Sequence, residues 1–322
     1  MEVFQLTVDV MLMMFTLIIA GYLLRKFKIL PEGSEVTMAR LETYALVPAL
    51  NFHNWATNCT VETMSENWTL IIYGLVIALA AMAVSYPLSR LFVRNFRESA
   101  KLEYERNIYK YAMTFSNFGF MGNFIILGVF GSEGLFRYLM FTMSMNFIVA
   151  SWGVYILVPK GNIKSKAALL KNIFTPPTIG MFAGGIVGIT GLTEKLPDFL
   201  LRAAENASNC MGPVAMILAG FVVGGYEFRT LLGKKKVYVA TLFRLIVIPS
   251  VLVTVLYWLG INKEIITLAL IAYATPLGLN TIVYPATYGG ETMTGAAMAM
   301  ISHTLSVVTI PLMYYVFIVT LF

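Results

Sequence analysis

Apolar residues fall into ten long runs along the chain, and short polar segments separate the runs. Most runs reach the roughly 20 residues that an α-helix needs to cross the hydrocarbon core of a bilayer. The pattern therefore predicts an all-α membrane protein with ten transmembrane helices. The predicted spans are residues 5–24, 34–56, 69–92, 107–130, 136–158, 176–191, 198–224, 237–259, 264–288 and 293–320.

Two of the runs, the fourth and the ninth, contain polar and helix-breaking residues where a continuous helix would have Leu or Ile. These stretches are Ser116–Phe124 and Thr275–Asn280. Backbone that leaves the helix at membrane depth has no water to bond, so it persists only where it is buried in protein or lines a cavity. We therefore predict two broken helices, whose new N-terminal ends direct partial positive charge at a ligand bound between them.

Residues at the two breaks are the main candidates for ligand binding. The amides of Asn117 and Asn280 can bond a carboxylate, or they can only cap exposed helix ends. The glycines permit a close helix crossing, or they pack as small residues in a bundle. Asn51, one turn after Pro48 in the second span, is a further candidate for the same pathway. The predicted substrate-binding set is Asn51, Ser116, Asn117, Gly119, Gly122, Thr275, Pro276, Gly278 and Asn280.

A few ionisable residues lie inside the predicted spans, where a charge is costly and is a functional hypothesis by default. Arg40 and Glu42 lie near the cytoplasmic end of the second span. His303 lies in the middle of the tenth span. This histidine can serve proton coupling, or it can be a hydrogen-bonded packing residue.

The two halves of the chain match each other at an offset of about 160 residues. Pro87 and Pro249 share this offset, and so do the two breaks. An odd number of helices per half turns the second half upside down relative to the first. The pattern predicts a five-plus-five inverted repeat, with halves at residues 1–160 and 161–322, in which the broken fourth and ninth helices cross.

Composition and charge agree with a protein that resides in lipid. Of 322 residues, 58% are hydrophobic and only 12% are charged, whereas a soluble domain is nearer one quarter charged. Lys and Arg outnumber Asp and Glu by 23 to 17. These basic residues gather in the odd-numbered loops, so they indicate membrane orientation and not nucleic-acid binding. We therefore expect both termini on the outer side of the cell membrane.

The sequence gives no indication of catalysis or of a resident cofactor. Cys59 and Cys210 have neither disulfide-framework nor metal-ligand spacing. Paired catalytic carboxylates and nucleophile constellations are also lacking. The N-terminus carries Glu2 and Asp9 in place of a basic region and runs into the first span, so we expect no removable signal peptide. We predict a protein that is not an enzyme and that needs no cofactor or metal.

The polar stretches carry a resemblance to a known family. Asn117, Gly119 and Gly122 resemble the fourth-helix motif of the auxin efflux carrier family. Pro276, followed by Tyr288, is similar to the second crossing motif of that family. The resemblance extends over essentially the whole chain.

Two departures from the family pattern are visible. The family usually has proline two residues after the glycine of its fourth-helix motif, and Phe124 stands there in this chain. The long hydrophilic central loop of many plant members is reduced to about Pro159–Thr175. The chain therefore most resembles a compact bacterial-type member, similar to malonate and malate permeases and related to plant PIN-type carriers.

The resemblance implies a fold like that of sodium/proton antiporters and bile-acid symporters. A scaffold domain would contain helices one, two, six and seven, and a transport domain would contain helices three to five and eight to ten. Family members move organic anions at the crossing of helices four and nine, and an elevator-like movement would give alternating access. We therefore expect a secondary transporter of small organic carboxylates in the lipid bilayer.

Two other functions stay open. A sodium-driven symporter similar to the bile-acid carriers would need a cluster of oxygen ligands beside the crossing. A non-transporting membrane sensor would bind its ligand without moving it. Coupling to protons or to sodium and assembly as a homodimer are both compatible with the sequence.

Overall fold

The computed structural model describes residues 2–159 and 174–321, and within these ranges the chain forms helices and no strands. The all-helical architecture expected from the apolar runs is therefore confirmed. A shorter apolar helix, Pro176–Ile189, accompanies six helical stretches that are long and apolar enough to cross a membrane. The six stretches are Phe4–Lys26, Thr69–Phe92, Ala100–Leu157, Asp198–Gly224, Lys235–Trp258 and Met293–Val319.

The described residues up to 159 contain α-helices joined in places by wider, π-helical turns, in which each backbone bond spans one residue more. The helices are α1 (Glu2–Lys26), α2 (Ser34–Leu41), α3 (Val47–Asn58), α4 (Val61–Asn67), α5 (Thr69–Phe92), α6 (Ala100–Thr114), α7 (Asn123–Ile148) and α8 (Val154–Leu157). The wide turns are η1 (Glu42–Leu46), η2 (Phe118–Gly122) and η3 (Val149–Gly153).

The described residues from 174 onward follow the same scheme. The α-helices are α10 (Pro176–Ile189), α11 (Asp198–Gly224), α12 (Phe228–Leu232), α13 (Lys235–Leu242), α14 (Ile248–Trp258), α15 (Lys263–Ala274), α16 (Asn280–Thr287) and α17 (Met293–Tyr314). A 3₁₀ turn, η4 (Leu192–Lys195), precedes α11, and the wide turns are η5 (Phe243–Val247) and η6 (Tyr315–Val319).

The longest helical stretch, Ala100–Leu157, is not one straight helix. Helix α6 ends at Thr114, and the chain becomes helical again at Phe118. Within α7, Gly131 has φ 68° and ψ −165°, a backbone conformation that glycine adopts most readily. Helix α7 therefore consists of two segments that meet at a sharp bend.

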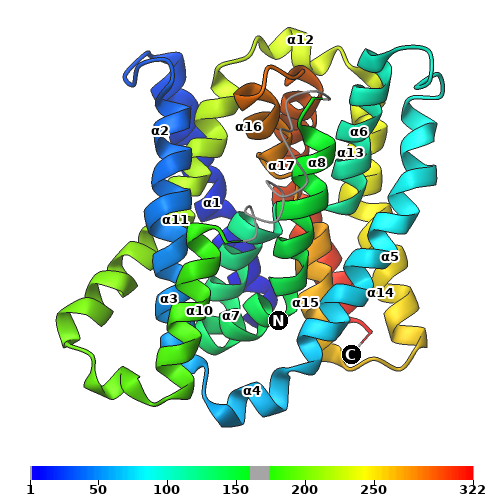
Figure 1. The fold of residues 1–322 in the computed structure, drawn as a ribbon. Coiled ribbons are helices and arrows are strands. Elements are labelled where there is room, and N and C mark those ends of the chain that lie inside the picture. Colours follow the sequence, from blue (N-terminus) through cyan, green and yellow to red (C-terminus); the bar gives the residue numbers. More distant parts are fainter. Residues whose placement is uncertain (1, 160–173, 322) are drawn as a thin grey trace.

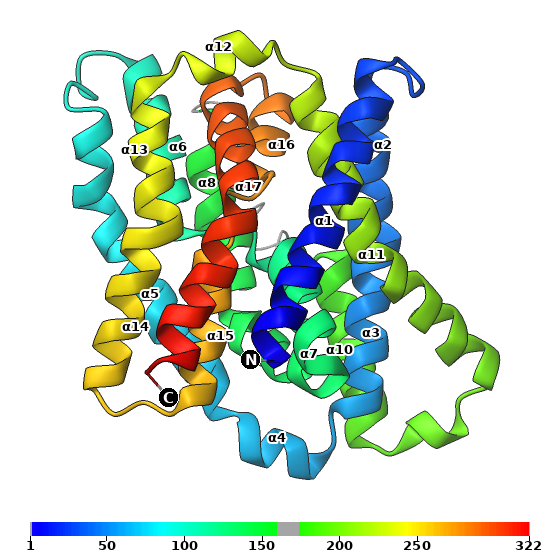
Figure 2. The ribbon, with the colours of Figure 1, turned by 180° about the vertical axis from the view of Figure 1, so that it is seen from behind.

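The helices pack in two groups, which Figures 1 and 2 show from opposite sides. The first helix group contains α1, α2, α3, α10 and α11, and its main packing pairs are α1 with α11 and α3 with α10. The second helix group contains α5 to α8 and α13 to α17, with α5 packed on α6 and α7 and with α14 packed on α15. The short helix α12 lies between α11 and α13 along the chain.

Glycines allow the backbones of the first helix group to touch. A methyl group on Gly21 of α1 would lie 2.0 Å from the carbonyl oxygen of Ile217 in α11. A methyl group on Gly180 of α10 would lie 2.4 Å from the carbonyl oxygen of Pro48 in α3. Small residues at such crossings are the usual means by which membrane helices approach closely. The first helix group is therefore a closely packed unit.

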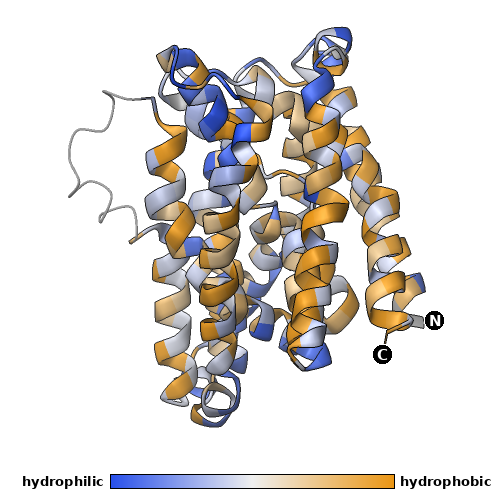
Figure 3. Cartoon of the chain, turned by 90° about the vertical axis from the view of Figure 1, so that its right-hand side faces the viewer, coloured by the Kyte–Doolittle hydropathy of each residue, from blue (hydrophilic) through white to orange (hydrophobic). Residues whose placement is uncertain are grey.

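Polar and apolar surfaces are separated along the bundle. Both termini lie at the same end as α4, whereas α12 and the loops after α1 and α5 lie at the opposite end (Figures 1 and 2). Between the two ends the helices are mainly apolar (Figure 3), and outward side chains such as Val76 and Val308 are 57% and 68% exposed. A broad apolar exterior of this kind is typical of membrane contact. The basic residues expected in the central loop, Lys160, Lys164, Lys166 and Lys171, lie outside the described residues.

Candidate functional site

The two polar stretches both begin outside the helices, and they touch each other. The backbone N–H of Asn117 donates to the carbonyl oxygen of Pro276 at 2.7 Å. The hydroxyl of Thr275 donates to the hydroxyl oxygen of Ser116 at 2.8 Å. The non-helical residues are 115–117 between α6 and η2, and 275–279 between α15 and α16. Backbone groups that the helices leave unpaired are thus satisfied from the other stretch.

A buried arginine bonds the helix ends that precede both stretches. Arg244, in the wide turn η5, is 1% exposed. Its guanidinium donates to the carbonyl oxygen of Tyr273, in the last turn of α15, at 2.7 Å and to that of Ala112, in the last turn of α6, at 3.4 Å. Among the described residues no carboxylate forms an ion pair with Arg244. The negative ends of two helix dipoles therefore compensate its charge.

Helix α17 supports the two stretches from behind. Its Ser302 hydroxyl oxygen accepts the backbone N–H of Leu277 at 3.0 Å. The Nδ1 atom of His303 lies 2.7 Å from the carbonyl oxygen of Ala299, so this nitrogen carries the proton. The Nε2 atom is then an acceptor, and it lies 3.4 Å from the Nδ2 atom of Asn117. In this arrangement His303 is hydrogen-bonded within α17, and its other ring nitrogen faces the Asn117 amide.

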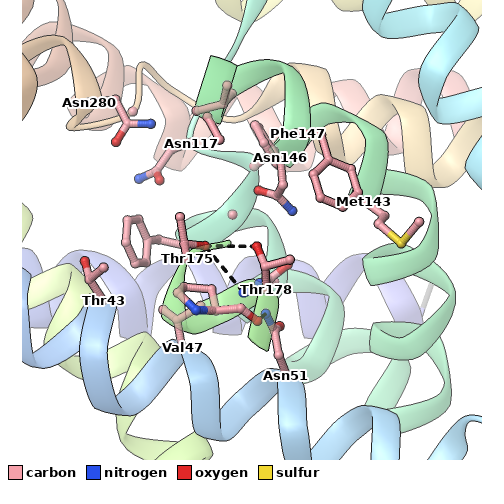
Figure 4. A pocket seen from close by; sticks show the side chains of 18 of the residues that line it. Thr43, Val47, Asn51, Asn117, Met143, Asn146, Phe147, Thr175, Thr178 and Asn280 are labelled. Carbon is pink, nitrogen blue, oxygen red and sulfur yellow. Dashed lines mark hydrogen bonds between the residues drawn. The ribbon is translucent and has the colours of Figure 1, made fainter. Parts of the chain in front are cut away.

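A cavity of about 220 Å³ opens beside the two stretches. Figure 4 shows Asn117, Asn280 and Asn146 on one side of it. Thr43 and Asn51 lie on the opposite side, on the helix formed by η1 and α3. Both helix groups therefore contribute to the wall. Other lining residues include Val47, Asn123, Met143, Phe147, Thr175, Thr178 and Tyr284.

Six of the nine residues in the predicted binding set line this cavity. They are Asn51, Ser116, Asn117, Gly119, Gly278 and Asn280. Thr275 and Pro276 lie behind the wall, where they join the two stretches. Gly122 lies against another side chain, since a methyl group there would be 2.1 Å from the hydroxyl oxygen of Tyr138. The absence of a side chain at Gly122 is therefore explained by its packing against Tyr138. The other candidates, apart from Thr275 and Pro276, meet at the cavity.

Several lining residues were not in the predicted set. Asn146 is an exposed amide in the second segment of α7, and its presence in an apolar run was a signal that could have been used. Thr175 caps the N-terminus of α10, and its hydroxyl lies 2.9 Å from that of Thr178. Tyr111 accepts a hydrogen bond from the Asn280 amide at 2.9 Å. Only the folded chain reveals these last neighbours.

The cavity combines amide and hydroxyl groups with apolar side chains such as Phe120, Leu139 and Met181, and it carries no charged side chain among its described lining residues. Its donors are amide and hydroxyl groups, together with the N-terminal ends of η2 and α16. The first N–H groups of a helix have no partner within the helix, and they carry partial positive charge. A cavity of this size is smaller than the roughly 300–1,000 Å³ of pockets for drug-sized ligands. The site can therefore accept a small polar or anionic molecule.

The fold and the cavity define a class of protein, namely a helical membrane protein in which two helix groups line a cavity without charged side chains in its described lining, at two interrupted helices. Residues 6–314 match the model of the membrane transport protein family, the auxin efflux carrier family, and the chain belongs to this family. The resemblance seen in the polar stretches is confirmed. The chain is accordingly a membrane transport protein with several membrane spans.

Two archaeal relatives support this assignment. A transporter of Methanocaldococcus jannaschii, described as uncharacterized, is 24% identical over 311 residues, which cover 96% of this chain and 98% of that protein. A second transporter with the same description, from Methanothermobacter thermautotrophicus, is 24% identical over 272 residues, which cover 83% of this chain and 84% of that protein.

Proposed function

We propose that this protein is a secondary transporter of small organic carboxylates, and that the cavity holds the substrate. The observation that carries the proposal is the meeting of two interrupted helices at a cavity without charged side chains. The amides of Asn117, Asn280 and Asn51 and the positive ends of η2 and α16 would replace the hydration of a carboxylate. Because no fixed cation is present in the described lining, the anion is held without being trapped.

The position of the cavity supports alternating access. Thr43, Asn51 and Thr178 belong to the first helix group, whereas Asn117 and Asn280 belong to the second. The glycine contacts of the first helix group make it a suitable scaffold. Movement of the second helix group along the first would carry the two interrupted helices, with the substrate, from one side of the membrane to the other.

The same proposal includes an inverted repeat of two five-helix halves. Ser116 and Thr275, which are 159 residues apart, bond each other across the crossing. Gly131 and Gly289, which follow the two interrupted helices, have similar positive φ values of 68° and 71°. Equivalent positions near an axis of pseudosymmetry are expected to meet in this way. The ten crossings would be α1, α2–α3, α5, α6 with the first segment of α7, the second segment of α7 with α8, α10, α11, α13–α14, α15–α16 and α17.

The charge distribution supports an orientation with both termini outside a cell membrane. The loop after α1 carries Lys28, and the loop after α5 carries Arg94 and Arg97. Both loops lie at the end of the bundle opposite the termini (Figure 1). Loops rich in Lys and Arg stay on the cytoplasmic side, so the α12 end would face the cytoplasm.

Counterflow in proteoliposomes tests the proposed function. The purified protein is reconstituted, and exchange of labelled malonate, malate and other small carboxylates is measured with and without sodium and a pH gradient. We expect exchange of at least one small carboxylate. Binding without flux would indicate a sensor, and strict dependence on sodium would indicate a sodium-driven symporter. Transport of cations or sugars, with no carboxylate exchanged, would contradict the substrate class.

A further inference from the structure

One carboxyl group lies outside the substrate cavity and has no partner. Glu42 is the first residue of η1, and 0% of its surface is exposed. Neither carboxyl oxygen has a hydrogen-bond partner among the described residues. An ionised carboxylate without partners is strongly unfavourable in such surroundings. The group is therefore expected to be neutral in this conformation, with a proton bound.

The elements packed against η1 are α2, α3, α10 and α11, and they give Glu42 no cation. Helix α10 has no ionisable residue. In α2, Arg40 is exposed, and Glu35 lies 3.6 Å from Arg25 in an ion pair. The other ionisable groups on these elements are Tyr44, His53, Asp198, Arg202, Glu205 and Cys210, and in the described part of the chain none of them bonds Glu42.

Glu42 continues a buried stripe that meets the second helix group. Leu46, Leu50 and Asn54 follow it at intervals of four residues, and all are buried. Residues at this spacing lie on one face of a helix. At the far end of the stripe, the Asn54 amide donates to the carbonyl oxygen of Ser132 in α7 at 3.0 Å. The stripe therefore touches the second helix group at its Asn54 end, whereas Glu42 at its other end is packed among elements of the first helix group.

The wide turn η1 connects this carboxyl group with the cavity. Thr43, the residue next to Glu42, lines the cavity together with Val47. Wide turns of this kind are frequent at functional sites in membrane and soluble proteins. A movement of the second helix group past Thr43 and Asn54 would therefore act on the helix that carries Glu42 while it moves the substrate.

We propose that Glu42 is a proton-binding site that couples transport to the pH gradient. Its carboxyl group is protonated while it is buried among α2, α3, α10 and α11. When the transport movement opens this packing to one side of the membrane, the group transfers its proton to water there. It takes a proton from hydronium on the other side before it is buried again. The coupling rests on the proposed transport function, whereas protonation in the conformation described here does not.

Infrared spectroscopy of the full-length protein in liposomes at neutral pH tests the protonation directly. A protonated carboxylic acid has a carbonyl-stretch band that a carboxylate lacks. We expect this band in the wild type, its loss in Glu42→Gln, and its retention in Glu62→Gln, a matched change at an exposed residue of α4. Glu42→Asp keeps a carboxyl group and should shift the band, which provides a second variant if Gln disturbs folding. Absence of the band from the wild type, or its persistence in Glu42→Gln, would overturn the proposal.

Accumulation of radiolabelled malonate in the same liposomes tests the coupling. A gradient of one pH unit across the liposome membrane supplies about 1.4 kcal/mol per proton. With one proton coupled to each malonate, it would drive about tenfold accumulation of malonate. We expect about tenfold accumulation for the wild type and Glu62→Gln and no accumulation for Glu42→Gln, which should still exchange malonate at equal pH. Accumulation by Glu42→Gln at the wild-type level would overturn the coupling. If no variant exchanges malonate, the transport proposal fails for this substrate, and the infrared result alone decides whether Glu42 binds a proton.

Discussion

The two interrupted helices have a similar outline but are held differently. After Thr114 three residues leave the helix, and Asn117 leads into the wide turn η2. In the other helix Thr275–Leu279 lie between α15 and the 8 residues of α16. The first interruption contributes the N–H of Asn117 to their contact, and the second contributes the carbonyl oxygen of Pro276. This direction is the only one available to the pair, because proline has no backbone N–H.

The amide side chains of the two interruptions also differ in their freedom. The Nδ2 atom of Asn117 lies 3.4 Å from the Nε2 atom of His303, a distance that is long for a hydrogen bond. Asn280 donates to Tyr111 of α6 at 2.9 Å. We infer that Asn117 is the freer donor for a ligand, whereas Asn280 braces α16 against α6. Similar positions in the two halves therefore need not have equal roles.

The largest expected effect concerns Arg244, whose guanidinium bonds the helix ends that precede both interruptions. Arg244→Met would leave the carbonyl oxygens of Ala112 and Tyr273 buried without a donor. We expect a loss of about 3 kcal/mol in the free energy of unfolding, since hydrogen bonds to charged groups are the stronger kind. Thermal unfolding in detergent measures it, with Arg202→Met, at an exposed residue, as the matched control. Arg244→Lys should be intermediate; stability equal to the wild type in both variants would show that the guanidinium holds neither end.

The next prediction compares the side-chain amides of Asn117 and Asn280 by their effect on carboxylate exchange. Asn117→Ala should abolish carboxylate exchange, and Asn280→Ala should reduce it less, because the Asn280 amide is already bonded to Tyr111. Loss of one hydrogen bond to a charged ligand corresponds to about tenfold to a hundredfold in exchange. Counterflow measures the change, and Asn209→Ala, at an exposed residue of α11, is the control. If folded Asn117→Ala protein exchanged carboxylates at the wild-type rate, Asn117 would not bind the substrate. If Asn280→Ala lost more exchange than Asn117→Ala, Asn280 would be the more important ligand.

The smallest effect compares a glycine from each interruption. A methyl group on Gly278 would lie 3.2 Å from the carbonyl oxygen of Ser116, whereas one on Gly119 would meet nothing within 4 Å. Gly278→Ala should therefore lower the free energy of unfolding by about 1 kcal/mol. Gly119→Ala should leave it unchanged or raise it by about 0.5 kcal/mol, because alanine favours a helical turn. Unfolding temperatures measured side by side test this difference in sign, and equal destabilisation would contradict it.

Much of the fold follows from hydropathy alone. An apolar run of bilayer length permits few structures besides a helix, so the predicted limits 69–92 and 198–224 coincide with Thr69–Phe92 and Asp198–Gly224. The interruptions were also visible, because Asn117 and Pro276 each lie with further polar residues and glycines in the middle of an apolar run. Local sequence is sufficient for both inferences.

The tertiary partners could not be predicted in the same way. No local signal in the sequence shows that Arg244 would reach Ala112 and Tyr273. The burial of Glu42 also depends on how α10 and α11 pack around η1. Contacts between segments more than 100 residues apart depend on helix rotation, which hydropathy in these nearly uniformly apolar helices specifies poorly.

The double attachment of Arg244 has a mechanical meaning. Since one side chain bonds the ends of α6 and α15 at once, separating those ends would leave a buried charge without partners. The crossing is therefore a rigid unit. In the proposed transport cycle, changes in packing are expected around this unit and not within it.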